Sequence, residues 1–344
     1  MKKIFMAALL LGTALSSQAQ SEWFQNVKFS GYGMVQYQAS DKDGAETNGF
    51  NLRLVRMSLE GRAHQDFYWK AQMQINGNTY DPDNAGKTDI RLVDLFGEWQ
   101  KYEFFKVKAG QFKRPFTFEN PMHPITQGFM SYSQNVSKLA GFSDRCGGQA
   151  SNGRDIGVQI QGDFLKNAEG RNLLHYQVGV FNGEGINQKD KDNRKDIIGG
   201  AWVMPIKGMR IGAFGWTGSR AGVGEKNRYA LSGEYTADDW TFRTEYIHSQ
   251  GWNAAHTSDK ADGIYALCIA PIQKNKMHVK ARYDLYREAK EWGQSKTQYE
   301  IGADYLFTKN LQLNVEYARI NDRTIADPDK HNYNMVDVEL DFRF

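Results

Sequence analysis

The feature that most restricts the fold of this chain is an alternation of apolar and polar residues with a period of two, which recurs along its length. In residues 67–75 the sequence FYWKAQMQI places aromatic or aliphatic side chains at every odd position and mostly polar ones between them. The same alternation occurs in residues 156–161, 277–285 and 311–317. Because residues two apart share one face of a β-strand, each segment predicts a strand with one apolar and one polar face.

The spacing of these segments predicts how the strands connect. Counting them gives about sixteen strands of roughly ten residues each, with centres near residues 33, 56, 71, 95, 108, 159, 178, 201, 213, 232, 244, 267, 281, 301, 315 and 339. Connections after even-numbered strands are short: 63–65, 100–103, 205–208, 237–239, 273–276 and 308–310, with a somewhat longer one around 166–171. Those after odd-numbered strands are longer and polar: 40–49, 76–88, 114–153, 182–195, 218–225, 251–262, 287–294 and 321–332. This alternation is typical of an all-β, antiparallel transmembrane β-barrel with short turns at one end and longer loops at the other.

The N-terminal residues are typical of a signal peptide. Lys2 and Lys3 precede an apolar stretch at 4–15 and a small-residue site at 17–19. We therefore expect a signal peptide at residues 1–19 and the β-barrel at residues 20–344. Without the two lysines the basic count falls from 43 to 41, against 40 acidic residues. This near-neutral balance disfavours a nucleic-acid partner.

The C-terminal segment 336–344 alternates strictly and ends on Phe344. A closing strand of this kind is similar to the signal that the outer-membrane barrel assembly machinery reads. Aromatic residues near strand ends share the apolar parity and predict girdles at the two membrane interfaces: Trp69, Trp99, Phe105, Trp240, Phe242, Tyr299, Tyr305, Phe342 and Phe344. These features predict a protein of the bacterial outer membrane, surrounded by outer-membrane lipids.

In a barrel wide enough to hold water, the inward side chains set the electric field that a solute meets. The basic residues expected to line the pore and bind anions are Arg53, Arg56, Lys70, Lys106, Lys108, Lys113, Arg114, Arg243, Lys280 and Arg282. The acids expected to face inward are Asp94, Glu98, Glu234, Glu245, Glu300, Asp304, Glu316, Asp337 and Glu339. This predicts one basic and one acidic wall. The alternative is that these charges only keep the lumen wet and pair across it.

Arg53 and Arg56 differ in parity, so a regular strand would point one of them at lipid. An arginine at mid-membrane on the lipid face costs about 2–4 kcal/mol. A β-bulge near Leu54 and Val55 would turn both arginines inward and the neighbouring apolar residues outward. We therefore predict a bulge there.

The connection 114–153 is too apolar for a solvated loop, with five phenylalanines or tyrosines among its residues 116–142. It follows the fifth strand, and we expect it to be the third extracellular loop, folded inward to form a constriction. Some of its charges would then line that constriction: Lys113, Arg114, Glu119, Lys138, Asp144 and Arg145. The alternative is a solvated lid over the barrel mouth.

Cys146 and Cys268 are the only two cysteines. They could form a disulfide or a metal pair, but one lies in a loop and the other within a strand, which favours two separate thiols. No metal ligand set, cofactor or catalytic residue is predicted.

Several stretches resemble the phosphate-selective porin O and P family, and the likeness covers essentially all of residues 20–344. They are LRLVRM at 52–57 continuing to Glu60-Gly61, VKAGQFKRPF at 107–116 with Glu119, RDIGV at 154–158, YQVGVFNG at 176–183, and ARYD at 281–284. The overall style is similar to members from Bacteroidota. The resemblance implies a sixteen-stranded homotrimeric barrel with an inward loop, in which an arginine ladder and a lysine cluster filter anions. This sequence departs from that pattern, because it has no regular ladder and many inward acids.

Together these observations predict a non-enzymatic outer-membrane porin for passive diffusion of small hydrophilic solutes, with anion or phosphate preference left open. One alternative is a barrel enzyme of the phospholipase kind, which would need a serine beside His248 or His256 near the outer rim. Another is a nutrient-binding or adhesin barrel, which would need longer loops.

Overall fold

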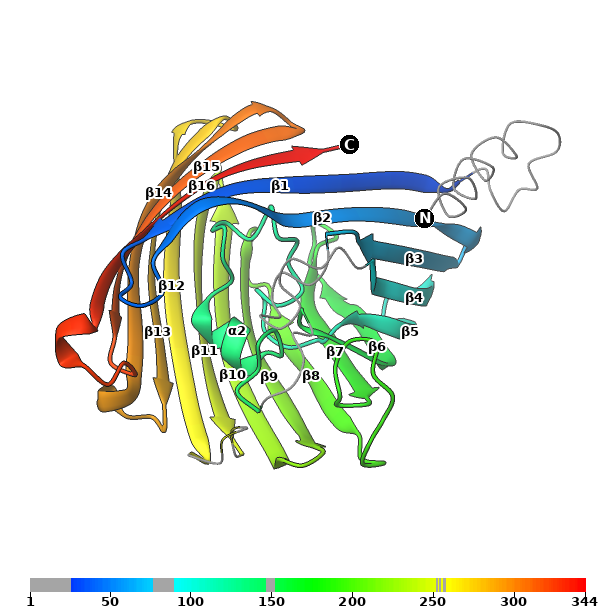
Figure 1. Cartoon of the computed structure of the whole chain (residues 1–344). Coiled ribbons are helices and arrows are strands. Elements are labelled where there is room, and N and C mark those ends of the chain that lie inside the picture. Colours follow the sequence, from blue (N-terminus) through cyan, green and yellow to red (C-terminus); the bar gives the residue numbers. More distant parts are fainter. Residues whose placement is uncertain (1–25, 77–89, 147–151, 252, 254, 256–257) are drawn as a thin grey trace, which may run out of the picture.

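The computed structural model describes residues 26–76, 90–146, 152–251, 253, 255 and 258–344, and these form a closed barrel of sixteen antiparallel strands (Figure 1). Each strand pairs with its neighbours in sequence, and the last pairs with the first. The strands are β1 (Lys28–Ser40), β2 (Thr47–His64), β3 (Phe67–Gln74), β4 (Arg91–Tyr102), β5 (Phe105–Lys113), β6 (Arg154–Lys166), β7 (Asn172–Phe181), β8 (Asp196–Val203), β9 (Met209–Arg220), β10 (Gly224–Ala237), β11 (Trp240–Gln250), β12 (Lys260–Gln273), β13 (Met277–Glu288), β14 (Ser295–Thr308), β15 (Leu311–Asp322) and β16 (Asn332–Arg343). The predicted fold class, strand number and strand centres are confirmed, whereas the predicted signal peptide lies outside the described residues.

Helical structure in the described residues is short. It consists of α2 (Gln134–Leu139) and the 3₁₀ turns η2 (Trp292–Gln294) and η3 (Pro328–Lys330). Among the described residues, none of these helices is long and apolar enough to span a membrane.

The connections alternate between turns and loops as predicted, with one exception, and the predicted loop 76–88 lies almost wholly outside the described residues. The predicted loop 218–225 is a turn of three residues, because β9 continues to Arg220 and β10 already begins at Gly224. Polar pairs such as Thr217 and Asn227, whose side chains are joined by a hydrogen bond of 2.6 Å, extend the two strands. Polar composition therefore does not end a strand where cross-strand pairing continues.

The two faces of the strands differ as the alternation predicts. Large apolar side chains such as Leu231 and Ile301 point outward and are 57% and 60% exposed. Carboxylates such as Glu245 and Asp284 point inward and are fully buried. An apolar outer surface over a charged interior is the arrangement that a barrel in lipid requires.

Closure of the barrel depends on two glycines of β1. The main chains of Gly31 and Phe344 exchange hydrogen bonds of 2.9 and 3.0 Å. The Phe344 and Phe342 rings lie over Gly31 and Gly33, where an added Cβ would come within 2.4 Å of a ring carbon. The terminal phenylalanines therefore pack on the bare backbone of the first strand.

The predicted β-bulge exists, but it lies one residue earlier than expected. Met34 pairs with Leu54 and Val35 pairs with Leu52, so Arg53 is the extra residue. Both arginines are buried, as predicted. The prediction was wrong for Leu54, which is fully buried in a cluster with Met34. Apolar packing against the loop residue Ile125 makes an inward leucine stable there.

The two cysteines are separate free thiols. Cys146 is buried in the long loop, and Cys268 lies in β12. Neither a disulfide nor a metal pair forms between them.

Candidate functional site: the lumen and its inserted loop

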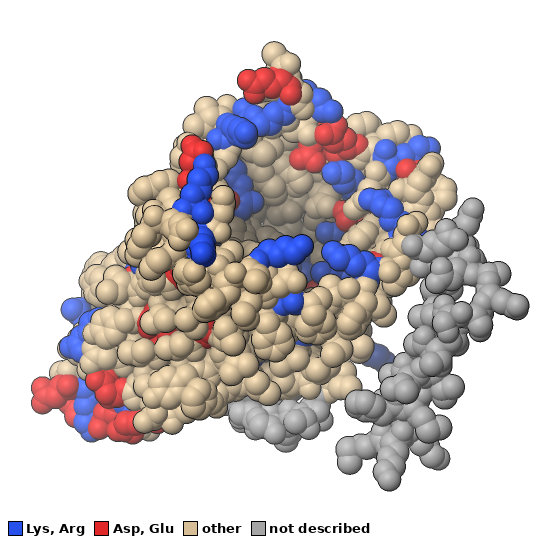
Figure 2. Space-filling view, turned by 90° about the horizontal axis from the view of Figure 1, so that it is seen from above, with Lys and Arg blue, Asp and Glu red and all other residues tan. Residues whose placement is uncertain are grey.

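Charged side chains surround a hollow when the molecule is seen from above (Figure 2). Six of the ten basic residues predicted to line the pore are buried: Arg53, Arg56, Arg114, Arg243, Lys280 and Arg282. The other four are partly exposed: Lys70, Lys106, Lys108 and Lys113. The ten basic residues differ in burial because they differ in their contacts with the long connection 114–153 and with the barrel wall.

The described part of the long connection, residues 114–146 and 152–153, lies against the inner face of the barrel. Helix α2 packs against β11, β12 and β13 on the inside (Figure 1). The side chains of Phe116, Phe118 and Phe129 are at most 2% exposed. A segment with such an apolar, buried content occupies part of the lumen and is not a solvated lid.

Glu245 of β11 is a wall carboxylate that accepts hydrogen bonds from the backbone of this loop. It accepts hydrogen bonds of 2.8 Å from the backbone N–H groups of both Phe118 and Glu119. The hydroxyls of Ser232 and Tyr265 donate to the same carboxylate at 2.5 and 2.7 Å. Glu245 therefore satisfies loop backbone groups that would otherwise be buried without a partner.

Two further wall carboxylates act in the same way. Glu316 accepts from the backbone N–H of Met130 at 2.9 Å, and Asp284 accepts from that of Gln134 at 2.8 Å. These three acids of the later strands thus face the loop backbone, and they do not form an acidic wall that faces water.

Four of the predicted pore-lining cations also hold the loop. Each donates to a loop carbonyl oxygen and pairs with a wall acid at the same time. Their loop and acid partners are, in turn, Gln127 and Glu234 for Arg243, Gly128 and Glu316 for Lys280, Ser131 and Glu300 for Arg282, and Met130 and Glu339 for Arg53. The charges of these four residues are compensated locally.

The far end of the loop has its own ionic anchors. Arg228 of β10 pairs with Asp144 at 2.6 Å and donates to the carbonyl oxygen of Leu139 at 2.7 Å. Arg145 pairs with Glu288 of β13. Although burial by itself would raise the pKa of Asp144, the adjacent Arg228 guanidinium holds that pKa well below its usual range.

The start of the loop is fixed by Arg114. Its guanidinium pairs with Asp155 of β6 at 2.9 Å and lies 5.0 Å from the centre of the Trp216 ring. Phe116 packs edge-on against the same tryptophan, with ring centres 5.5 Å apart. Arg114 is therefore enclosed between loop and wall.

Two of the partly exposed lysines have acidic partners on neighbouring strands. Lys106 pairs with Asp163 at 3.2 Å, and Lys108 lies 3.9 Å from Glu98. At such partly solvated sites each pair adds little net charge to the lumen.

Arg56 of β2 and Lys70 of β3 are different. Arg56 donates to the amide oxygen of Gln74 and to the hydroxyl of Tyr32, all at 3.1 Å. Lys70 has neither an ion pair nor a hydrogen bond within the described residues. Neither cation has an acidic partner among the described residues.

Lys113, at the end of β5, likewise has only neutral partners in the described part of the chain. Its ammonium group donates to the carbonyl oxygen of Met122 at 2.6 Å and to the hydroxyl of Tyr132 at 2.8 Å. The wall formed by β2, β3 and β5 therefore carries three basic side chains that have no acidic partner among the described residues. We refer to Arg56, Lys70 and Lys113 as the basic cluster.

His123, on the loop, lies next to the basic cluster. Desolvation by the surrounding protein lowers its pKa to about 3, with further lowering from the positive charges of Lys113, Arg56, Arg343 and Lys70. The imidazole is therefore neutral at pH 7.

Some residues of this region were not identified from the sequence. Tyr32, Gln74, Tyr132 and His123 supply neutral groups around the basic cluster. Tyr32 could have been found, because it shares the inward parity of Gln36 on β1. The others depend on where the loop lies, which no local pattern specifies.

The described residues were also compared with what a metal site or a hydrolytic site would need. They contain no group of three or more histidine, cysteine or acidic side chains placed to hold a metal ion. His248, considered for an enzyme, packs against the ring of Tyr229, while His256 lies outside the described residues.

Solved porins have a similar fold. The anion-selective porin from Comamonas acidovorans aligns with a TM-score of 0.69 and 13% identity, over 92% of this chain and 99% of that one. Salmonella typhi OmpF, in complex with daunomycin, aligns with a TM-score of 0.67 and 11% identity over 93% and 98%. OmpT, an outer membrane protein of Vibrio cholerae, aligns in its trimer form with a TM-score of 0.59 and 12% identity over 92% and 99%. These identities support a shared fold only.

No curated protein matches the chain in sequence. The model of one protein family, described as Gram-negative porin, matches residues 6–324. This match spans most of the chain and agrees with the closed barrel and with an outer-membrane location. The chain belongs to the Gram-negative porin family.

Proposed function

We propose that this protein lets small hydrophilic solutes diffuse passively through a lumen narrowed by loop 114–153, with a preference for anions. The basic cluster of Arg56, Lys70 and Lys113 carries this proposal. Within the described residues these three cations have neutral partners or none, whereas the other predicted pore-lining cations pair with acids.

Unpaired cations act on a solute through the field they leave in the lumen. A water-filled passage with low-dielectric walls concentrates that field, which raises the local concentration of anions and lowers that of cations. The N–H donors of the cluster suit chloride, carboxylate and phosphate alike. The proposal is therefore a general anion preference, and phosphate is one candidate among the anions.

Assembly and surroundings form part of the proposal. The Vibrio cholerae OmpT structure in its trimer form supports a homotrimer. Outer-membrane lipids would surround the apolar outer face, and the barrel assembly machinery would recognise the closing strand that ends at Phe344.

The test is the reversal potential of purified protein in a planar bilayer under a KCl gradient. Lys70→Gln removes a cation that has no partner among the described residues, so we expect the reversal potential to move toward that of a cation-selective pore. A reversal potential identical to that of the wild type would contradict the role of Lys70.

The matched control removes one cation together with its acid. Lys106→Gln with Asp163→Asn eliminates an ion pair of 3.2 Å and leaves the net charge unchanged. We expect this double variant to keep the wild-type reversal potential. If both variants shift it equally, selectivity does not depend on which cations are unpaired.

A further inference from the structure

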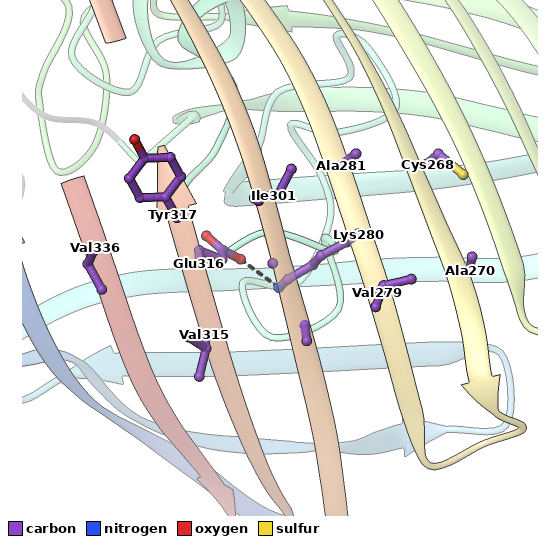
Figure 3. A pocket seen from close by; sticks show the side chains of 12 residues that line it. Cys268, Ala270, Val279, Lys280, Ala281, Ile301, Val315, Glu316, Tyr317 and Val336 are labelled. Atoms are coloured by element: carbon purple, nitrogen blue, oxygen red, sulfur yellow. Dashed lines mark ion pairs between the residues drawn. The ribbon is translucent and has the colours of Figure 1, made fainter. Parts of the chain in front are cut away.

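A groove runs across the outward face of β12, β13, β14 and β15 (Figure 3). It forms because small side chains face each other across the strands: Cys268 pairs with Ala281, and Ala303 pairs with Val279. Larger side chains such as Ile301, 60% exposed, form its edges. Its volume is about 580 Å³.

A second hollow of about 630 Å³ continues the groove toward the loop end of the barrel. The two share Cys268, Ala281, Ile301 and Tyr317 in their lining. The continuation ends at Arg319, which lies three residues before the end of β15. An apolar groove in the lipid-facing surface thus has a cation at its extracellular end.

Arg319 is exposed, and only part of its guanidinium group makes hydrogen bonds within the described residues. One terminal nitrogen donates to the side-chain oxygen of Asn334 at 2.9 Å, and its other guanidinium nitrogens have no partner within the described residues. Asn334 in turn donates to Asp41 through its backbone N–H and its amide, so the asparagine lies between the two charges. Tyr299, directly opposite Arg319 on β14, is 56% exposed.

We propose that this groove binds one lipid of the outer leaflet whose headgroup carries an anionic phosphate, with an acyl chain along Cys268, Ala281 and Ala303. The phosphate accepts hydrogen bonds from the Arg319 guanidinium and the Tyr299 hydroxyl. Charge complementarity selects this occupant, because phosphate is the anionic group found at that depth of a membrane. The apolar lining excludes a water-soluble ligand.

The test measures binding of dioleoylphosphatidic acid to the detergent-purified protein by native mass spectrometry, with dioleoylglycerol as the lipid that lacks only the phosphate. We expect one retained phosphatidic acid per chain and at least tenfold weaker retention of dioleoylglycerol. Arg319→Ala should weaken phosphatidic acid binding about tenfold, the loss of one charge-assisted contact. Arg62→Ala, which removes an exposed arginine at the turn end, should leave it unchanged. Equal retention by the two arginine variants, or equal binding of the two lipids, would overturn the proposal.

A second pair of variants tests the groove itself. Ala281→Phe fills the groove and should abolish binding, whereas Ala213→Phe places the same ring on the outward face of β9 and should not. Wild-type conductance of each variant shows that the barrel is folded. If Ala281→Phe keeps its lipid but dissociates an oligomer, a second copy of the chain covers the groove and the lipid proposal is wrong.

Discussion

Lys70 and Lys280 are both inward lysines, but they differ in what surrounds the ammonium group. Lys280 is buried between Glu316 and the carbonyl oxygen of Gly128. Lys70 is partly exposed and unpaired within the described residues. Burying a cation is costly unless an acid or hydrogen bonds compensate its charge, whereas a cation facing water needs no acid. We infer that the presence of an acidic partner separates the cations that hold the loop from those that act on a solute.

At the same scale, His123 provides a pH test. Because desolvation and nearby cations lower its pKa to about 3, it stays neutral from pH 7.5 to pH 5. We expect wild-type protein and His123→Gln to show the same anion-to-cation permeability ratio across that range. An ordinary pKa would instead add a positive charge near pH 6.5 and raise anion preference in the wild type only. A wild-type-specific rise would show that the imidazole titrates normally.

At the scale of elements, the described part of loop 114–153 is held by hydrogen bonds from its backbone to wall side chains. Glu245→Ala would leave the N–H groups of Phe118 and Glu119 without their acceptor, at a cost of about 1–3 kcal/mol for each buried group. We expect larger and noisier single-channel conductance, because the loop becomes mobile. Glu103→Ala, at an exposed turn, is the control. Quiet recordings of wild-type size from Glu245→Ala would contradict this role of the loop.

The pairing of β4 with β5 depends on Gly110. Its φ is +131°, and an added Cβ would lie 2.2 Å from the carbonyl oxygen of Leu95. Gly110→Ala should therefore lower the yield of folded barrel, measured by heat-modifiable migration on gels. Gly215→Ala, where a Cβ meets open space, should fold like the wild type. Equal yields would show that the backbone adjusts at Gly110.

The sequence predicts the strands well because alternation is a local property that every strand must have. It also predicts that Arg53 and Arg56 both face inward, since lipid cannot accept either. It misplaces the bulge by one residue because the inward position of Leu54 depends on Ile125, more than seventy positions away. The strands can therefore be predicted from the local sequence pattern. The position of a β-bulge depends on distant residues that pack against the strand.

At the scale of the whole molecule, the lumen charges could be identified from the sequence, but their pairing could not. Arg53 pairs with Glu339, 286 positions further along the chain, because closure brings the first and last strands together. The wall acids were expected to face solute, yet several accept hydrogen bonds from the loop backbone. Counting all acidic side chains that face inward therefore overstates the negative charge that a solute meets in the lumen.

The most direct test of the account is the current carried by purified wild-type protein in a planar bilayer with KCl of different concentration on its two sides. We predict large ohmic steps and a reversal potential of the sign that chloride selectivity gives. Absence of conductance over a range of salt concentrations would contradict the channel, and a reversal potential of the potassium-selective sign would contradict the role of the basic cluster.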